Sequence, residues 1–89
     1  MSLLRRFWFQ FERTSNLPPG VGIGCGVTAL DREDALRLLG ERVFTSGDFP
    51  PVKSVVVDID ISLLDAGHVR PNMGNPVVYG IWFPMGYES

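Results

Sequence analysis

Apolar side chains recur at every second position in several stretches of this chain, and this period of two most constrains its fold. Side chains of a β-strand point alternately to its two faces, so a period of two predicts a strand with one apolar face. The clearest case spans residues 5–12, whose apolar face carries Phe7, Phe9 and Phe11. The opposite face carries Trp8 among polar residues.

Two later stretches alternate in the same way and predict two further strands. In residues 53–62 the apolar face consists of Val55, Val57, Ile59 and Ile61. In residues 77–83 one face consists of Val77, Tyr79, Ile81 and Phe83, and Trp82 points the other way. We expect these faces and the phenylalanine face to share one core.

A strand of unusual composition is predicted in residues 20–29, where glycines alternate with apolar residues. Glycine in a strand indicates that another group approaches the backbone closely. Aromatic rings commonly cover such glycines, so we expect Trp8 and Trp82 on the glycine-bearing face. A phosphate-binding GxGxxG loop is the alternative, but Cys25 or Val27 stands where its last glycine is required.

One helix is predicted, beginning after Asp31 and ending near Phe44. Asp31 can cap a backbone amide, and Asp34 follows three residues later as in an acidic capping box. Apolar residues then recur at helical spacing, namely Ala35, Leu36, Leu39 and Val43. The order strand, strand, helix, strand, strand predicts an α+β two-layer sandwich with one sheet and a single helix on one face. We expect the tryptophan-bearing face to stay open, because the chain has no second helix to cover it.

The composition restricts the setting in which the protein acts. A chain of 89 residues accommodates one domain, residues 1–89. Its net charge is -2 and its basic residues are not clustered, which argues against a nucleic-acid partner. No apolar run is long enough to span a membrane, and the single Cys25 cannot form an internal disulfide, which favours a cytoplasmic location. Hydrophobic residues make up 45%, so we expect an apolar surface that meets a partner, with a homodimer as one form.

Residues for metal or covalent chemistry are few. Asp58 and Asp60 share a predicted strand face and could hold a hard cation, but a solvated pair beside basic residues is the favoured explanation. Zinc requires more Cys and His ligands than this chain supplies. Cys25 and His68 could form a nucleophile and base, but a thiol within an apolar strand is buried and inert. We therefore predict no metal, no cofactor and no catalytic residue.

The irregular segment 63–76 is the main candidate binding site, because long connections in compact domains often carry function. We expect Val69 and Met73 to point inward and Arg70 outward. The candidate binding residues are His68, Arg70, Asn72 and Asn75 in this segment, and Trp8 and Trp82 on the sheet. The alternative is that the histidine and the two asparagines satisfy the backbone of the segment itself.

Three blocks of sequence, GCGVTALDREDALRLL, VDIDISLLDAGHVRPNMGNP and GIWFP, together resemble a group of small, uncharacterised bacterial proteins. Those proteins are single-domain chains that carry these blocks in the same order. The resemblance implies a bacterial or phage protein of the cytoplasm. It implies no activity, ligand or site residue.

Three functions are consistent with these features. The leading hypothesis is a non-catalytic binding protein, such as a regulator, inhibitor or immunity-type protein. It would bind a protein partner or a second copy through the open tryptophan face and the 63–76 segment. The second is binding of a small anionic, nucleotide-like ligand between Trp8 and Trp82, with Arg70 near its charge. The third is an enzyme, for which no general base with an orienting partner is visible.

Overall fold

The computed structural model describes residues 3–12, 17–18, 20–45, 49–85 and 87. Its strands are β1 (Arg5–Phe11), β2 (Cys25–Ala29), β3 (Val52–Val57) and β4 (Gly80–Phe83). Its α-helix is α1 (Arg32–Arg42), and two 3-10 helices, η1 (Ile61–Leu63) and η2 (Arg70–Asn72), lie between β3 and β4. Residues 14–20 and 48–51, whose proline and turn-forming residues predict connectors, lie partly outside the described residues.

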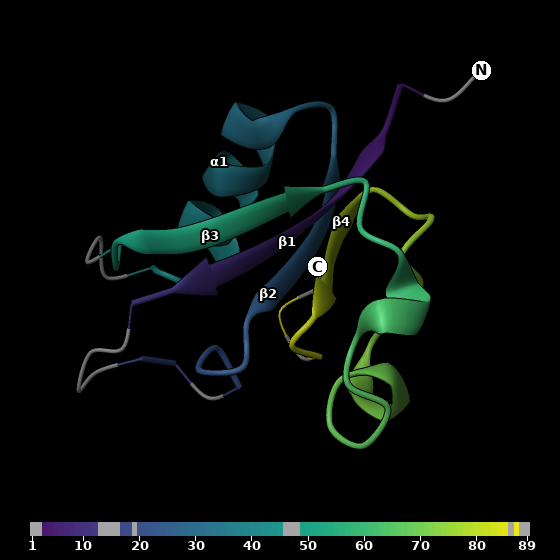
Figure 1. Ribbon diagram of the computed structural model, residues 1–89. Coiled ribbons are helices and arrows are strands. Elements are labelled where there is room, and N and C mark those ends of the chain that lie inside the picture. Colours follow the sequence, from purple (N-terminus) through teal and green to yellow (C-terminus); the bar gives the residue numbers. More distant parts are fainter. Residues whose placement is uncertain (1–2, 13–16, 19, 46–48, 86, 88–89) are drawn as a thin grey trace.

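The four strands form one antiparallel sheet in the order β3-β1-β2-β4. The helix α1 packs against one face of this sheet (Figure 1). The predicted α+β fold with a single helix on one sheet is therefore confirmed. Because β1 and β2 occupy the centre, β3 and β4 are the two edges of the sheet.

The start of α1 is fixed by the predicted cap. The Asp34 amide donates a hydrogen bond of 2.8 Å to the side chain of Asp31. The reciprocal bond comes from the Leu30 amide, which donates to Asp34 Oδ2 at 3.1 Å. Such bonds satisfy amides that the first turn of a helix leaves unpaired. The sequence thus predicted the beginning of the helix correctly. The reciprocal bond comes from the amide of Leu30, whereas a capping box would use the amide of Asp31 itself.

The helix covers the phenylalanine face of β1, as the sequence predicted. Phe9, Val27 and Leu39 are fully buried in this cluster. Just beyond the helix, Phe44 contacts the edge of Phe11, with 5.1 Å between the ring centroids. Each large apolar side chain buried in this way contributes roughly 1.5–3 kcal/mol. This helix-side cluster is the larger of the two apolar clusters in the described part of the chain.

The opposite face of the sheet is covered, so the prediction that it stays open is wrong. Trp8 and Trp82 pack there with residues of the segment that follows β3, including Leu64 and Val69. Val69 is fully buried and Met73 packs against the cluster, as predicted. The segment appears in green in Figure 1. The apolar side chains of this segment that cover the tryptophans are Ile59, Ile61, Leu64, Val69 and Met73.

The strand predicted at 53–62 ends early, and this ending supplies part of the cover. Asp58 follows β3 with a φ of 56°, a left-handed conformation that interrupts a strand. The alternation is lost there, so Ile59 and Ile61 pack on the tryptophan side and not beneath the helix. Two hydrogen bonds hold Ile59 to Arg6: the Ile59 amide donates to the Arg6 carbonyl, and Arg6 Nε donates to the Ile59 carbonyl.

The glycine-rich strand is also shorter than predicted. Residues 20–23 form a turn in which the Ile23 amide donates to the Gly20 carbonyl at 3.3 Å. Ile23 is exposed, and β2 begins only at Cys25. The alternation of glycine with apolar residues therefore spans a turn and a strand, and Val21, Cys25 and Val27 all lie in the helix-side cluster.

The last strand begins at Gly80, three residues later than predicted. Gly80 has a φ of 129°, which side chains other than glycine rarely allow. Val77 and Tyr79, predicted to lie on the core face, are exposed outside the sheet. Phe83, predicted beneath the helix, packs instead against Trp8, with 5.6 Å between the ring centroids.

Candidate functional site

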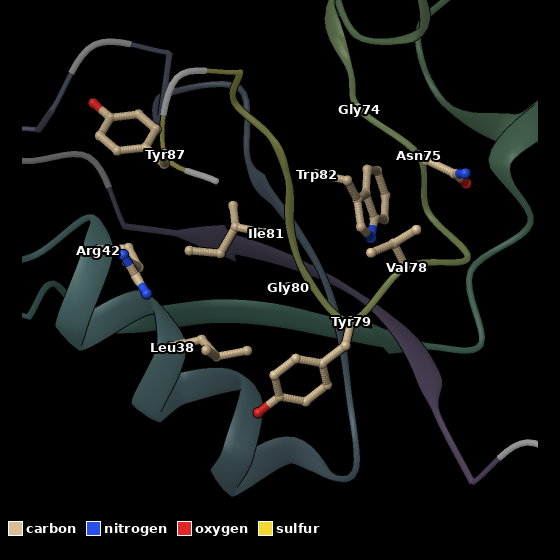
Figure 2. A pocket seen from close by; sticks show the side chains of 10 residues that line it. All are labelled: Leu38, Arg42, Gly74, Asn75, Val78, Tyr79, Gly80, Ile81, Trp82 and Tyr87. Atoms are coloured by element: carbon tan, nitrogen blue, oxygen red, sulfur yellow. The ribbon is translucent and has the colours of Figure 1, made fainter. Parts of the chain in front are cut away.

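A groove of about 430 Å³ lies between α1 and β4, at one edge of the sheet (Figure 2). Leu38 and Arg42 line it from α1, and their spacing of four residues places them on the same side of the helix. Gly80, Ile81 and Trp82 line it from β4. The groove thus combines a helix and an edge strand that are far apart in the sequence.

The segment between η2 and β4 forms a further wall. Gly74, Asn75, Val78 and Tyr79 of this segment line the groove, together with Tyr87 near the C-terminus. The Gly74 amide donates a hydrogen bond of 2.7 Å to the Trp82 carbonyl, which holds the segment against β4. In Figure 2 the rings of Tyr79 and Tyr87 lie on either side of Ile81.

Tyr79 connects this wall to the helix through an ionic network. Its hydroxyl donates to Asp34, with 2.8 Å to the nearer carboxylate oxygen, and accepts a bond of 3.0 Å from Arg37. Burial alone would raise the pKa of Asp34, but hydrogen bonds from Arg37, the Leu30 amide and Tyr79 lower it below its ordinary value. The bond to Asp34 raises the pKa of Tyr79. The carboxylate is therefore charged and the phenol protonated at neutral pH.

Arg37 and Arg42 differ in their surroundings. Arg37 forms ion pairs with Asp34 at 2.8 Å and with Glu41 at 2.9 Å. The side chain of Arg42 makes no hydrogen bond or ion pair with any residue that the structure describes. Arg42 is also the charged residue among those lining the groove. The groove therefore carries one guanidinium group that the described chain leaves available.

Both tryptophans predicted as binding residues are buried, with Trp8 7% and Trp82 2% exposed. Their rings stack on each other, 5.9 Å apart at an interplanar angle of 26°, which leaves no space for a planar ligand between them. Trp8 lies over Gly24 and Trp82 over Gly26, as predicted for rings that cover strand glycines. Their predicted position is confirmed, and the face that carries them is buried, whereas the sequence predicted an open one.

The two asparagines of the 63–76 segment serve its own backbone. Asn72 Nδ2 donates a hydrogen bond of 2.9 Å to the His68 carbonyl, and Asn75 Oδ1 accepts one of 3.0 Å from the Val77 amide. Both contacts agree with the alternative prediction that these asparagines satisfy backbone groups of the segment. Asn75 also lines the groove.

His68 and Arg70 point to solvent on the same segment. His68 Nδ1 lies 3.3 Å from Asp65 Oδ2 in an exposed pair. Asp65 also accepts hydrogen bonds from the Gly67 and His68 amides, and these bonds lower its pKa. Arg70 is exposed, as predicted.

The structure brings two of the predicted binding residues, Asn75 and Trp82, to the groove. The others lie outside its lining, namely Trp8, His68, Arg70 and Asn72. Sequence reasoning missed Leu38, Arg42 and Tyr79. The helical spacing of Leu38 and Arg42 indicated that they share a face, but no local pattern indicated that β4 lies opposite them.

The residues considered for covalent or metal chemistry lie in different surroundings. Cys25 is fully buried in the helix-side cluster, where burial raises the pKa of its thiol to about 12. His68 is exposed on the segment that covers the opposite face. Asp58 forms an ion pair of 3.6 Å with Arg5, and Asp60 accepts a hydrogen bond from the Ser62 amide. The described residues contain no group of three or more Asp, Glu, His or Cys side chains arranged to hold a metal ion.

No protein-family model, curated protein or solved structure matches this chain. The resemblance to small bacterial proteins therefore stays a prediction. Among the described residues, no helix has the length and apolar character needed to cross a membrane.

Proposed function

We propose that this protein is a non-catalytic binding protein and that the groove between α1 and β4 holds a small molecule with an apolar body. The observation that carries this proposal is the size and lining of the groove, about 430 Å³ between apolar and aromatic side chains. Small-molecule sites typically measure roughly 300–1,000 Å³ and combine an apolar lining with a few polar groups. The proposed ligand site is thus the groove beside β4 and not the space between the tryptophans.

The polar groups around the groove support binding more than turnover. Its described lining holds one guanidinium group, from Arg42, and two phenols, from Tyr87 and from Tyr79, which already bonds to Asp34. Cys25 and His68 both lie outside this lining. A general base with an orienting partner beside a nucleophile would instead favour catalysis.

A fluorescence titration tests the proposal. N-phenylnaphthylamine, a neutral probe that brightens in apolar sites, should bind saturably to the full chain. Val78→Phe should fill the groove and weaken binding about tenfold, because Val78 lines it. Val77→Phe is the matched control, since Val77 is more exposed and is not part of the lining. Equal binding by both variants, or no saturable signal, would contradict the proposal.

Self-association through β3 is a second candidate function, favoured by one observation. Val56 and Val57 are 43% and 46% exposed on β3, which pairs only with β1 among the described strands. An edge strand with exposed apolar residues is suited to pairing with another chain. A homodimer should sediment as twice the 9.9 kDa monomer. Val56→Lys should return it to the monomer, and a wild type that stays monomeric at high micromolar concentration would exclude this function.

Two further features support contact with a protein partner and a cytoplasmic location. His68 and Arg70 are exposed on a segment held by internal hydrogen bonds, so they could contact such a partner without reordering the chain. Cys25 is a free thiol, which suits a reducing compartment.

A further inference from the structure

We infer that the ligand of the α1–β4 groove is a small anion with an aromatic or aliphatic body, and that Arg42 binds its anionic group. This inference rests on the proposed binding function and names the class of ligand. It follows from the charge of the described lining, which includes Arg42 and no Asp or Glu. A cationic ligand would meet an uncompensated like charge in this groove.

The local sequence gives Arg42 no ion-pair partner within the described helix α1. Ion pairs along a helix form between residues three or four apart, and Leu38 and Leu39 occupy those positions before Arg42. Its neighbour Glu41 is held by Arg37 at 2.9 Å. The guanidinium of Arg42 can therefore donate to an added carboxylate, sulfonate or phosphate without breaking an ion pair of the described chain.

The rest of the lining determines the body of the ligand. Leu38, Val78 and Ile81 present aliphatic carbon, and the rings of Tyr79 and Tyr87 add aromatic surface. Tyr79 already donates to Asp34 and accepts from Arg37, so its hydroxyl is engaged. These surroundings suit a body of one or two rings or a short aliphatic chain, with the charge at the end that meets Arg42.

Two probes with the same ring system separate the contribution of the anionic group to affinity from that of the apolar body. Anilinonaphthalene sulfonate carries an anion on the framework of N-phenylnaphthylamine. In the wild type the sulfonate should bind about fivefold more tightly, which is the effect of one well-placed charge at a partly exposed site. Arg42→Gln should remove this difference by weakening the sulfonate alone. Arg70→Gln is the matched control, because Arg70 is an exposed arginine outside the lining.

Unchanged binding of the neutral probe by Arg42→Gln excludes a structural loss at the end of α1, where a basic residue also interacts favourably with the helix dipole. Arg42→Lys then tests whether the positive charge is what the sulfonate recognises. The lysine variant keeps the charge and should retain most of the affinity for the sulfonate. Equal weakening by Gln and Lys, or equal binding of the two probes to the wild type, would overturn the inference and leave the proposed function intact. If neither probe binds, the proposed function fails and this inference fails with it.

Discussion

The indole Nε1 of Trp82 donates a hydrogen bond of 3.1 Å to the hydroxyl of Thr28, a buried side chain on the adjacent strand. The same hydroxyl donates to the carbonyl of Pro76. Thr28 thus connects β2, β4 and the segment that forms one wall of the groove. Because polar groups buried without a partner are unfavourable, this one hydroxyl stabilises three parts of the fold.

Thr28→Val should lower the free energy of unfolding by about 1–3 kcal/mol, since valine preserves the shape but leaves the indole and the carbonyl without their partner. Urea denaturation measures the change. Thr45→Val, at an exposed position, should change it by less than about 0.5 kcal/mol. A Thr28→Val protein as stable as the wild type would show that the hydroxyl is dispensable.

Gly26→Ala should destabilise the protein by about 1–3 kcal/mol, because a Cβ there would overlap the ring of Trp82. At Gly22 a Cβ would meet nothing within 4 Å, so Gly22→Ala should be nearly neutral. Thermal melting of both variants provides the comparison. The double variant Gly26→Ala, Trp82→Phe should lose less stability than the sum of its single changes, because the smaller ring leaves space. If the stability losses of the two single variants simply add in the double variant, the ring of Trp82 does not contact residue 26.

Asn72→Ala should lower stability by about 0.5–1.5 kcal/mol, because its amide bonds the His68 carbonyl at 2.9 Å. Arg70→Ala should leave the melting temperature nearly unchanged, since its side chain is exposed. Denaturation of the two variants in parallel measures both effects. A larger loss of stability in Arg70→Ala than in Asn72→Ala would show that Arg70, and not Asn72, holds the segment.

Hydrogen exchange should protect the amides that hold the same segment in place. The Val69 amide donates to the Asp65 carbonyl at 3.1 Å, and the Gly74 amide donates to Trp82 at 2.7 Å. Both should exchange more slowly than free amides, because exchange requires these bonds to open. Unprotected exchange across residues 66–76 would contradict an ordered segment.

Stability should fall as the pH drops below about 4. The folded-state pKa of Asp34 lies below its ordinary value of 3.8, so its contribution is present above that value and is lost as the pH falls through the folded-state pKa. Asp34→Asn should lower stability near pH 7 and flatten its acid dependence. Glu33→Gln is the control, because Glu33 is exposed and makes none of these bonds. Melting curves of the three proteins between about pH 7 and 3 measure the effect, and an unchanged acid slope in Asp34→Asn would contradict it.

Local periodicity predicted the elements in which one pattern persisted without interruption. The alternation of β1 and the spacing and cap of α1 placed the helix-side core correctly, including Phe9 and Leu39. Gly24, just before β2, and Gly26 within it predicted the positions of both tryptophans, because missing side chains leave a space that a large ring can fill. These features depend on neighbours along the chain.

The candidate site depended on features that no local pattern contains. The left-handed conformation of Asp58 transfers Ile59 and Ile61 to the opposite face, and Gly80 starts β4 late enough to leave Val78 and Tyr79 beside the groove. The alternation of apolar and polar residues in the sequence continues past Asp58 and Gly80, although the backbone changes conformation at both residues.

The sequence by itself determined the number and type of the main elements, the apolar stripe of α1 and the position of the tryptophans over the strand glycines. The tertiary structure decided that the segment after β3 buries those tryptophans and that Leu38 and Arg42 meet the edge of β4. The physical reason is that side-chain periodicity is set by the local backbone, whereas a groove forms only where elements distant in sequence pack together.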